Sequence, residues 1–296
     1  MKLTGKPETD ASMGDLNFAR LQLALPTRFL SWLIYLVTRI RQRSFKNLFI
    51  RQFMSLYRIS LAENDRSQVE QYESFNDFFT RGLRPGARVL DPSPQALLSP
   101  VDGTVSQAGE IVGDRIFQAK GHEYSAQELL GGDAELAAPF EGGRFTTIYL
   151  APNNYHRIHM PLTGTLRHWV YVPGRLFSVN PATVRAMPGV FARNERVCAV
   201  FDTDRGPFAL VMVGALFVGS METVWAGRVT PPHKRGAVEQ FRPIHPVELR
   251  RGDEMGRFNM GSTVILLTPP GMVEWDRVMT PGNPLRMGQR IAKFRA

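Results

Sequence analysis

The chain has 296 residues, of which 43% are hydrophobic and 21% are charged, and this composition excludes bulk disorder. That length allows one large domain or two modest ones, each with a substantial core. The only cysteine, Cys198, excludes an intrachain disulfide and any paired-cysteine metal or redox motif. Its apolar neighbours, Val197 to Val200, predict a buried position in a strand.

The net charge of +9 is concentrated near the N-terminus. Residues 16–60 contain no acidic residue and eight basic ones: Arg20, Arg28, Arg39, Arg41, Arg43, Lys46, Arg51 and Arg58. The longest uncharged run there, Phe29–Thr38, is ten residues long, about half of the ~20 needed to span a bilayer. We therefore expect no transmembrane helix. The polar residues 1–15 are predicted to be a flexible tail and lack the features of a signal peptide.

Residues 16–70 are predicted to form basic amphipathic helices. Large apolar side chains recur at helical spacing in two stripes: Phe29, Trp32, Leu33, Leu36 and Ile40, then Phe45, Leu48, Phe49, Phe53 and Leu56. Arginines beside such stripes are typical of helices that lie in a membrane interface. The alternative is a helix pair packed on its own domain, with solvated arginines. Nucleic acid is not the expected partner, because phosphate binding would leave this apolar area unused.

Residues 71–296 are predicted to form a β-rich domain. Ser74 can cap a short helix over residues 75–80, and Asp77 lies near the positive end of that helix. Short apolar runs follow between Gly, Pro and Asn, and we expect strands over 146–150, 169–172, 197–201, 208–213 and 263–267, with a helix over 126–130. The expected fold class is therefore α+β, with N-terminal amphipathic helices followed by a catalytic domain of short strands.

Three short clusters carry residues with chemical potential: Ser99–Thr104 with Asp102, Tyr155–Pro161 with His156 and His159, and Arg257–Val264 with Ser262. Separately, each has an ordinary structural explanation: Asp102-Gly103 is typical of a turn, and the two histidines would point to opposite faces of a strand. No further ligands complete a metal set, so no metal site is predicted. Together the clusters supply an acid, an imidazole and a hydroxyl, the parts of an activated nucleophile.

These clusters, in this order, resemble the bacterial phosphatidylserine decarboxylase precursor. The Gly261-Ser262-Thr263 run looks like the self-cleavage motif of that family, normally Leu-Gly-Ser-Thr. Met260 replaces the leucine, a change that keeps volume and polarity. The resemblance spans about residues 70–290 and includes the segments 118–122, 171–174, 177–180, 191–196 and 222–227.

The resemblance implies that the chain makes its own cofactor. Ser262 Oγ would attack the Gly261 carbonyl, and elimination from the resulting ester would leave a pyruvoyl group at position 262. The products would be a β chain, 1–261, and an α chain of 35 residues, 262–296. His159 would be the base, and Asp102 would hold its imidazole. Gly261, without a side chain, would leave its carbonyl open and could adopt strained backbone angles.

The resemblance also implies the second reaction, conversion of phosphatidylserine to phosphatidylethanolamine. The pyruvoyl carbonyl would form a Schiff base with the substrate amine and take up the electrons released with CO₂. His156 would place the carboxylate or return a proton. Neither a metal nor an exogenous organic cofactor is implied. The expected partners are phosphatidylserine and an anionic membrane surface, with the two chains remaining associated, a homodimer, and a peripheral position on the cytoplasmic face of the cell membrane.

Two other functions remain open from the sequence. A serine hydrolase acting on lipid esters would use Asp102, His159 and Ser262 as an intact triad and keep one full-length chain. A non-catalytic membrane-surface protein would keep the fold and never mature.

Overall fold

The computed structural model describes residues 10–119, 121–217 and 220–295. The first nine residues of the predicted tail, and Lys120 within the segment 118–122, lie outside the described residues. Helices account for 24% of the chain and strands for 33%, with the N-terminal helices preceding a strand-rich domain. This confirms the predicted α+β class.

The helices lie mostly near the N-terminus and at the margins of the strand-rich domain. They are α1 (Met13–Ala24), α2 (Thr27–Val37), α3 (Arg43–Tyr57), α4 (Phe75–Phe79), α5 (Ala126–Leu129), α6 (Ala134–Ala137), α7 (Pro181–Ala186) and α8 (Val190–Arg193), with 3-10 turns η1 (Val69–Gln71) and η2 (Ala138–Phe140). Ser74 caps α4 through the Asp77 amide, as the sequence predicts.

The strands are short, and the five expected runs all lie within or overlap one of them. They are β1 (Ala96–Leu98), β2 (Gly103–Glu110), β3 (Arg115–Ala119), β4 (His122–Ser125), β5 (Arg144–Tyr149), β6 (Arg157–His159), β7 (Gly164–Val172), β8 (Arg196–Thr203), β9 (Gly206–Val213), β10 (Met221–Thr223), β11 (Gly227–Thr230), β12 (Glu239–Phe241), β13 (Glu248–Leu249), β14 (Glu254–Phe258), β15 (Thr263–Thr268), β16 (Val273–Trp275), β17 (Pro284–Leu285) and β18 (Arg290–Phe294).

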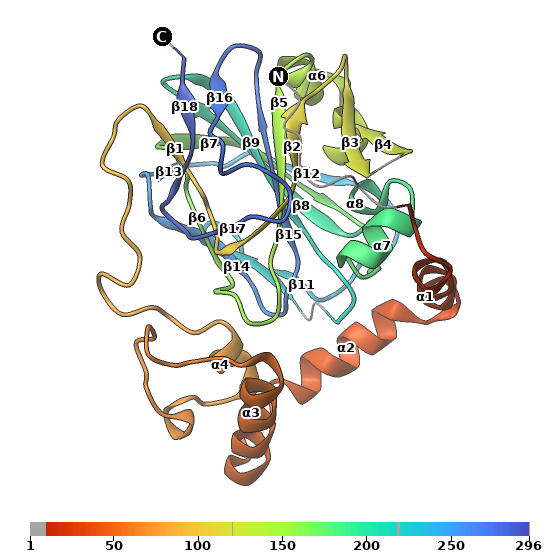
Figure 1. The fold of residues 1–296 in the computed structure, drawn as a ribbon, viewed down its shortest axis with the longest axis vertical. Coiled ribbons are helices and arrows are strands. Elements are labelled where there is room, and N and C mark those ends of the chain that lie inside the picture. The colour runs from red at the N-terminus through yellow and green to blue at the C-terminus, as the bar shows by residue number, and fades with distance from the viewer. Residues whose placement is uncertain (1–9, 120, 218–219, 296) are drawn as a thin grey trace.

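The largest sheet has the order β12-β7-β8-β9-β15-β5-β2-β17, with β13 also paired to β7. Each strand of this sheet runs antiparallel to the strands beside it. The sheet extends across the domain (Figure 1). Strand β15 lies inside this sheet between β5 and β9, and all six of its residues are buried. Smaller sheets have the orders β11-β10-β14-β6 and β1-β18-β16, and β3 pairs with β4. Cys198 is fully buried in β8, as expected.

Helices α1 to α3 form an arm along one side of the strand-rich domain (Figure 1). Helix α1 begins at Met13, inside the stretch expected to be tail, because Ser12 and Asp15 form a capping box. It packs on α7, where Gln22 donates to Thr183 and its side-chain oxygen accepts from the Ser178 amide. No helix within the described ranges is both long and apolar enough to cross a bilayer.

Helix α2 is amphipathic, but small polar side chains face the domain and large apolar side chains face solvent. Its buried side chains are Thr27 and Ser31, whereas the members of the predicted apolar stripe within the helix are 43–58% exposed: Phe29, Trp32, Leu33 and Leu36. Ile40 of the first predicted stripe follows the helix and is also exposed. The apolar stripe therefore faces away from the domain.

The second predicted stripe divides between two environments. In α3, Phe49 and Phe53 pack on Phe75 at ring separations of 4.3 and 4.9 Å, within a small core distinct from that of the large sheet. Three other members of the stripe stay exposed: Phe45, Leu48 and Leu56. Part of α3 is therefore structural, and the rest continues the exposed apolar surface of α2.

Candidate active site

The large sheet brings two of the sequence-predicted residues to the same end of neighbouring strands. Tyr149 of β5 pairs with Thr104 of β2 on one side and with Thr263 of β15 on the other. Asp102 and Ser262 immediately precede these two strands. Because adjacent strands are ~4.8 Å apart, the two backbones are separated by about 10 Å across β5.

Ser262 is fully buried, and its Oγ has no hydrogen-bond partner among the described residues. The adjoining Gly261 lies so close to the neighbouring loop that an added Cβ would be 3.3 Å from both His156 Cε1 and the Leu150 carbonyl oxygen. Its φ is outside the left-handed region, so the backbone freedom of glycine is not used in that way in the uncleaved chain. A glycine is favoured here because of the close approach of this loop.

His156 is 1% exposed and stacks on the Phe79 ring at 4.2 Å. Its Nε2 donates to the Ala151 carbonyl at 3.1 Å, which leaves Nδ1 as an acceptor without a partner in the described part of the chain. Burial, followed by the nearby Arg81 charge, lowers the pKa of His156 to about 3. The imidazole is therefore neutral at physiological pH.

His159 lies on β6 and has both ring nitrogens occupied. Nδ1 donates to the Gly252 carbonyl at 2.8 Å, so Nε2 is the acceptor and receives the Tyr155 hydroxyl at 2.9 Å. Burial lowers the pKa of His159, and the bond to Gly252 opposes that shift. The carbonyl of Gly252 thus sets the tautomer of this ring and leaves Nε2 as its basic nitrogen.

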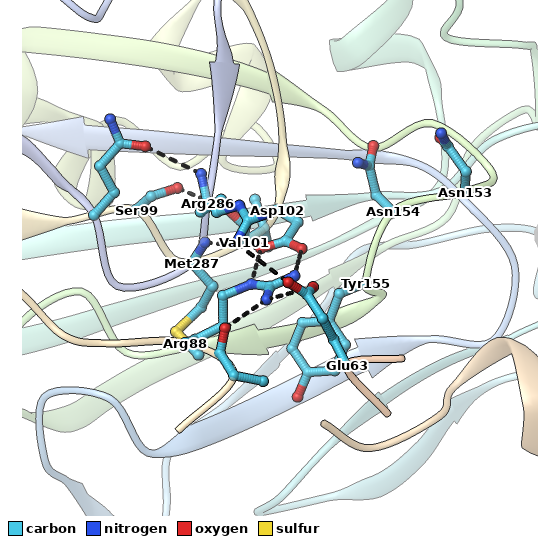
Figure 2. A network of polar contacts seen from close by, with 12 residues as sticks. Glu63, Arg88, Ser99, Val101, Asp102, Asn153, Asn154, Tyr155, Arg286 and Met287 are labelled. Atoms are coloured by element: carbon cyan, nitrogen blue, oxygen red, sulfur yellow. Dashed lines mark hydrogen bonds and ion pairs between the residues drawn. The ribbon is translucent and has the colours of Figure 1, made fainter. Parts of the chain in front are cut away.

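Asp102 is held by other partners than the sequence predicted (Figure 2). Its oxygens accept from Arg88 Nε at 2.9 Å, Arg88 Nη2 at 2.5 Å and the Met287 amide at 2.9 Å. Within the described residues Asp102 and His159 share no hydrogen bond, and Asp102 acts on this imidazole through its charge, so the role that the resemblance gives Asp102 stays a prediction. Asp102 already accepts three hydrogen bonds, two of them from one guanidinium, and these bonds fix the orientation of its carboxylate.

Sequence reasoning missed several charged and polar residues of this region. Arg88 also pairs with Glu63, which in turn contacts Arg286 beyond the expected cleavage point (Figure 2). Tyr155 was part of a cluster that the sequence singled out, but it had no role there. Arg81 lies two residues after the end of the capped helix α4, and that position was its only signal. No group of three or more His, Cys, Asp and Glu side chains in the described ranges could hold a metal ion.

A buried serine at a strand start, next to a neutral imidazole and a closely approached glycine, is typical of a site built for nucleophilic attack. Comparison with known proteins identifies the class. A family model described as phosphatidylserine decarboxylase matches residues 75–293, and a second, described as PSD, matches residues 18–58.

Curated relatives agree with that match. A phosphatidylserine decarboxylase proenzyme of Pseudomonas fluorescens is 54% identical over 91% of this chain and 94% of its own length. Proteins with the same name from Pseudomonas putida and Pseudomonas entomophila are 53% and 54% identical, each over 92% of this chain and 95% of its own length. The chain belongs to the phosphatidylserine decarboxylase family. The resemblance drawn from the motifs is thereby confirmed, and the serine hydrolase alternative finds no support. Enzymes of this family are in general pyruvoyl-dependent.

Proposed function

We propose that this chain is a proenzyme that cleaves itself between Gly261 and Ser262 and then converts phosphatidylserine to phosphatidylethanolamine. The observation that carries the proposal is the buried, unpartnered Ser262 hydroxyl next to Gly261, in a chain 54% identical over 272 residues to a protein named a proenzyme of this activity. A buried hydroxyl without a hydrogen-bond partner destabilises the fold, so its presence indicates a functional role.

In the first step, Ser262 Oγ attacks the carbonyl carbon of Gly261, and His159 takes the hydroxyl proton. Burial lowers the pKa of both rings, and the pKa of about 3 makes His156 the weaker base in the proenzyme. Tyr155 bonds to His159 Nε2, so this hydroxyl must either move aside or relay the proton. Asp102 acts through Arg88 and the Met287 amide by fixing the end of β2.

The residues around Ser262 suit a pyruvoyl group at that position. The site is buried and His156 Nδ1 is free to bond a polar ligand. A pyruvoyl group at residue 262 supplies an electron sink for decarboxylation. We assign the return of a proton to the substrate carbon to His156, whose Nδ1 has no partner in the described part of the chain. No metal or exogenous organic cofactor enters this proposal.

The exposed apolar surface of α2 and α3 supports peripheral attachment to a membrane. Large apolar side chains and arginines share one arm, and such a combination binds anionic lipid surfaces. The family acts on membrane lipids. We place the arm on the cytoplasmic face, with phosphatidylserine entering from the leaflet. The homodimer remains a proposal that rests on the family resemblance.

The test of self-cleavage compares the parent with Ser262→Ala on a denaturing gel. The parent is expected to give two chains and to release CO₂ from phosphatidylserine. Ser262→Ala is expected to stay full length and inactive, because no hydroxyl remains to attack. A full-length active parent would support the hydrolase reading, and a cleaved Ser262→Ala protein would contradict the proposal.

A further inference from the structure

Arg81 is a buried cation that forms no ion pair with a carboxylate in the part of the chain that the structure describes. It is 4% exposed, its guanidinium lies 5.2 Å from the centre of the Phe78 ring, and Nη2 donates to the main-chain carbonyls of Asn153 and Asn154, at 3.1 and 3.2 Å. Its Nη1 is buried and has no partner among the described residues. The charge of Asp102 acts on Arg81, but this carboxylate is already paired with Arg88. Burying an unpaired guanidinium is costly, so its retention calls for an anion.

A second buried arginine shows which hydrogen-bond partners a structural guanidinium has in this chain. Arg196 is 2% exposed and also has no carboxylate partner among the residues that the structure describes, but its nitrogens donate to four main-chain carbonyls: Leu129, Ala192, Asn194 and Glu128. Main-chain carbonyls can therefore satisfy a buried arginine of this protein completely. Arg81 differs because one of its terminal nitrogens is left over.

Arg81 and the scissile bond contact the same loop, residues 150–156. Gly261 lies against Leu150 and His156, and Arg81 bonds to Asn153 and Asn154. The segment before the bond also rests on the segment before Arg81, because the Asn76 side chain donates to the Asn259 carbonyl at 2.9 Å. Unpartnered polar atoms of Arg81, His156 and Ser262 thus gather around one loop, which is what a site awaiting a polar ligand looks like.

Self-cleavage itself creates an anion at this place. In the ester, the Gly261 carbonyl carbon is bonded to Ser262 Oγ. An imidazole of the site removes the Cα proton of residue 262, a Cα=Cβ double bond forms, and the Cβ–Oγ bond breaks. The electron pair of that bond leaves on the Gly261 carboxylate, and water then converts the dehydroalanine to pyruvoyl with release of ammonia. Negative charge therefore develops on Gly261 in the elimination step.

We propose that Arg81 stabilises the carboxylate that leaves from Gly261, so that the buried cation of the proenzyme becomes an ion pair in the mature enzyme. The inference rests on the proposed self-cleavage and adds a residue that acts in its second half. Positive charge placed in advance where negative charge develops is the kind of preorganisation that lowers a barrier without reorganisation. Attack by Ser262 places negative charge on the Gly261 carbonyl oxygen only transiently, whereas elimination leaves a full carboxylate there, so loss of Arg81 should slow elimination more than attack and the ester should accumulate.

The test follows self-cleavage over time in Arg81→Gln and Arg81→Lys. Both variants keep a donor toward the Asn153 and Asn154 carbonyls, and only Lys keeps the charge. Arg81→Gln is expected to slow chain separation on the order of 10²-fold, as for loss of one preorganised donor. Its full-length band should hold the ester, which hydroxylamine splits. Arg81→Lys should mature faster than Arg81→Gln.

Two controls distinguish loss of the Arg81 charge from other causes of slow chain separation. Ser262→Ala cannot form an ester and should resist hydroxylamine. Asn154→Ala removes the side-chain bond to the Ala151 amide, 2.7 Å long, and so loosens the same loop without changing charge. Normal maturation of Arg81→Gln, equal delay in both Arg81 variants, or the same trapped ester in Asn154→Ala would overturn the role of Arg81. A parent that never cleaves would instead overturn the proposed function itself.

Discussion

His156 is the residue whose ionisation the fold changes most clearly within the site. Its pKa is about 3 in the folded chain, below the ordinary value of 6.5, because the ring is completely buried. The unfolded chain therefore binds more protons between pH 6.5 and pH 3, and the free energy of unfolding falls as the pH is lowered through that window. The lowered pKa of His159 acts in the same direction.

The expected size of this effect can be measured in the uncleaved Ser262→Ala background. From pH 7 to pH 5, His156 alone should remove about 2 kcal/mol from the free energy of unfolding. Urea denaturation at the two pH values measures it. Ser262→Ala/His156→Asn should lose correspondingly less over the same range, since asparagine does not titrate. Equal losses in the two proteins would show that His156 is not the buried titrating group.

The two histidines should separate by the stage at which their loss acts. His159→Ala should leave full-length precursor, because the proposed base is missing. His156→Ala should mature to two chains and then decarboxylate about 10²–10⁴-fold more slowly, the range typical of losing a general acid–base group. A gel and a CO₂ assay on each variant measure both stages. If His156→Ala blocks cleavage and His159→Ala does not, the assignment is wrong. His156, which lies next to Gly261, would then be the base of self-cleavage.

At the residue scale the sequence predicted identities better than contacts. Motif resemblance selected Ser262 and His156, and the fold places both beside Gly261. The motifs did not predict the partners of Asp102, because neither Arg88 nor Met287 lies in a motif that links it to Asp102. Such partners depend on which distant strands meet, and spacing along the chain carries no information about that.

Among the elements, α2 most directly connects sequence pattern with function. Its periodicity predicted an amphipathic helix, and the direction of its apolar face follows only from the structure, where Thr27 and Ser31 point inward. The strands were predictable from short apolar runs between turn residues. Their order in the sheet was not, because β15 inserts between β5 and β9 through pairings far apart in the sequence.

Substitutions on the exposed face of α2 should weaken membrane binding and leave folding intact. Trp32→Ser with Leu36→Ser is expected to reduce sedimentation with phosphatidylglycerol vesicles about tenfold or more, since transfer of one large apolar side chain contributes ~1.5–3 kcal/mol. High salt should weaken binding of the parent further. The matched control is Ile244→Ser, which changes a 93% exposed apolar residue outside the arm. A similar loss in the control, or none in α2, would contradict attachment through this helix.

Deletion of the whole arm would be a poorer experiment. Phe49 and Phe53 pack on Phe75, so removal of α3 would uncover the small core next to α4. The loss of activity would then have a structural cause, and point substitutions on the exposed face avoid it.

For the molecule as a whole, cleavage at residue 261 would divide the covalent chain without dividing the fold. The α chain would contribute β15 to the interior of the large sheet, with β9 and β5 of the β chain on either side. It would also contribute β18, which pairs with β1, and the Met287 amide that bonds Asp102. We therefore expect the two chains to remain associated until the protein is denatured.

The most direct test of the central claim is the mass of the purified protein under native and denaturing conditions. We expect one native particle that separates on denaturation into residues 1–261 and 262–296. The smaller chain should be lighter by one ammonia than the same peptide beginning with serine, because pyruvoyl replaces its N-terminal residue. A single intact chain in active protein, or an α chain that begins with an unmodified serine, would contradict it.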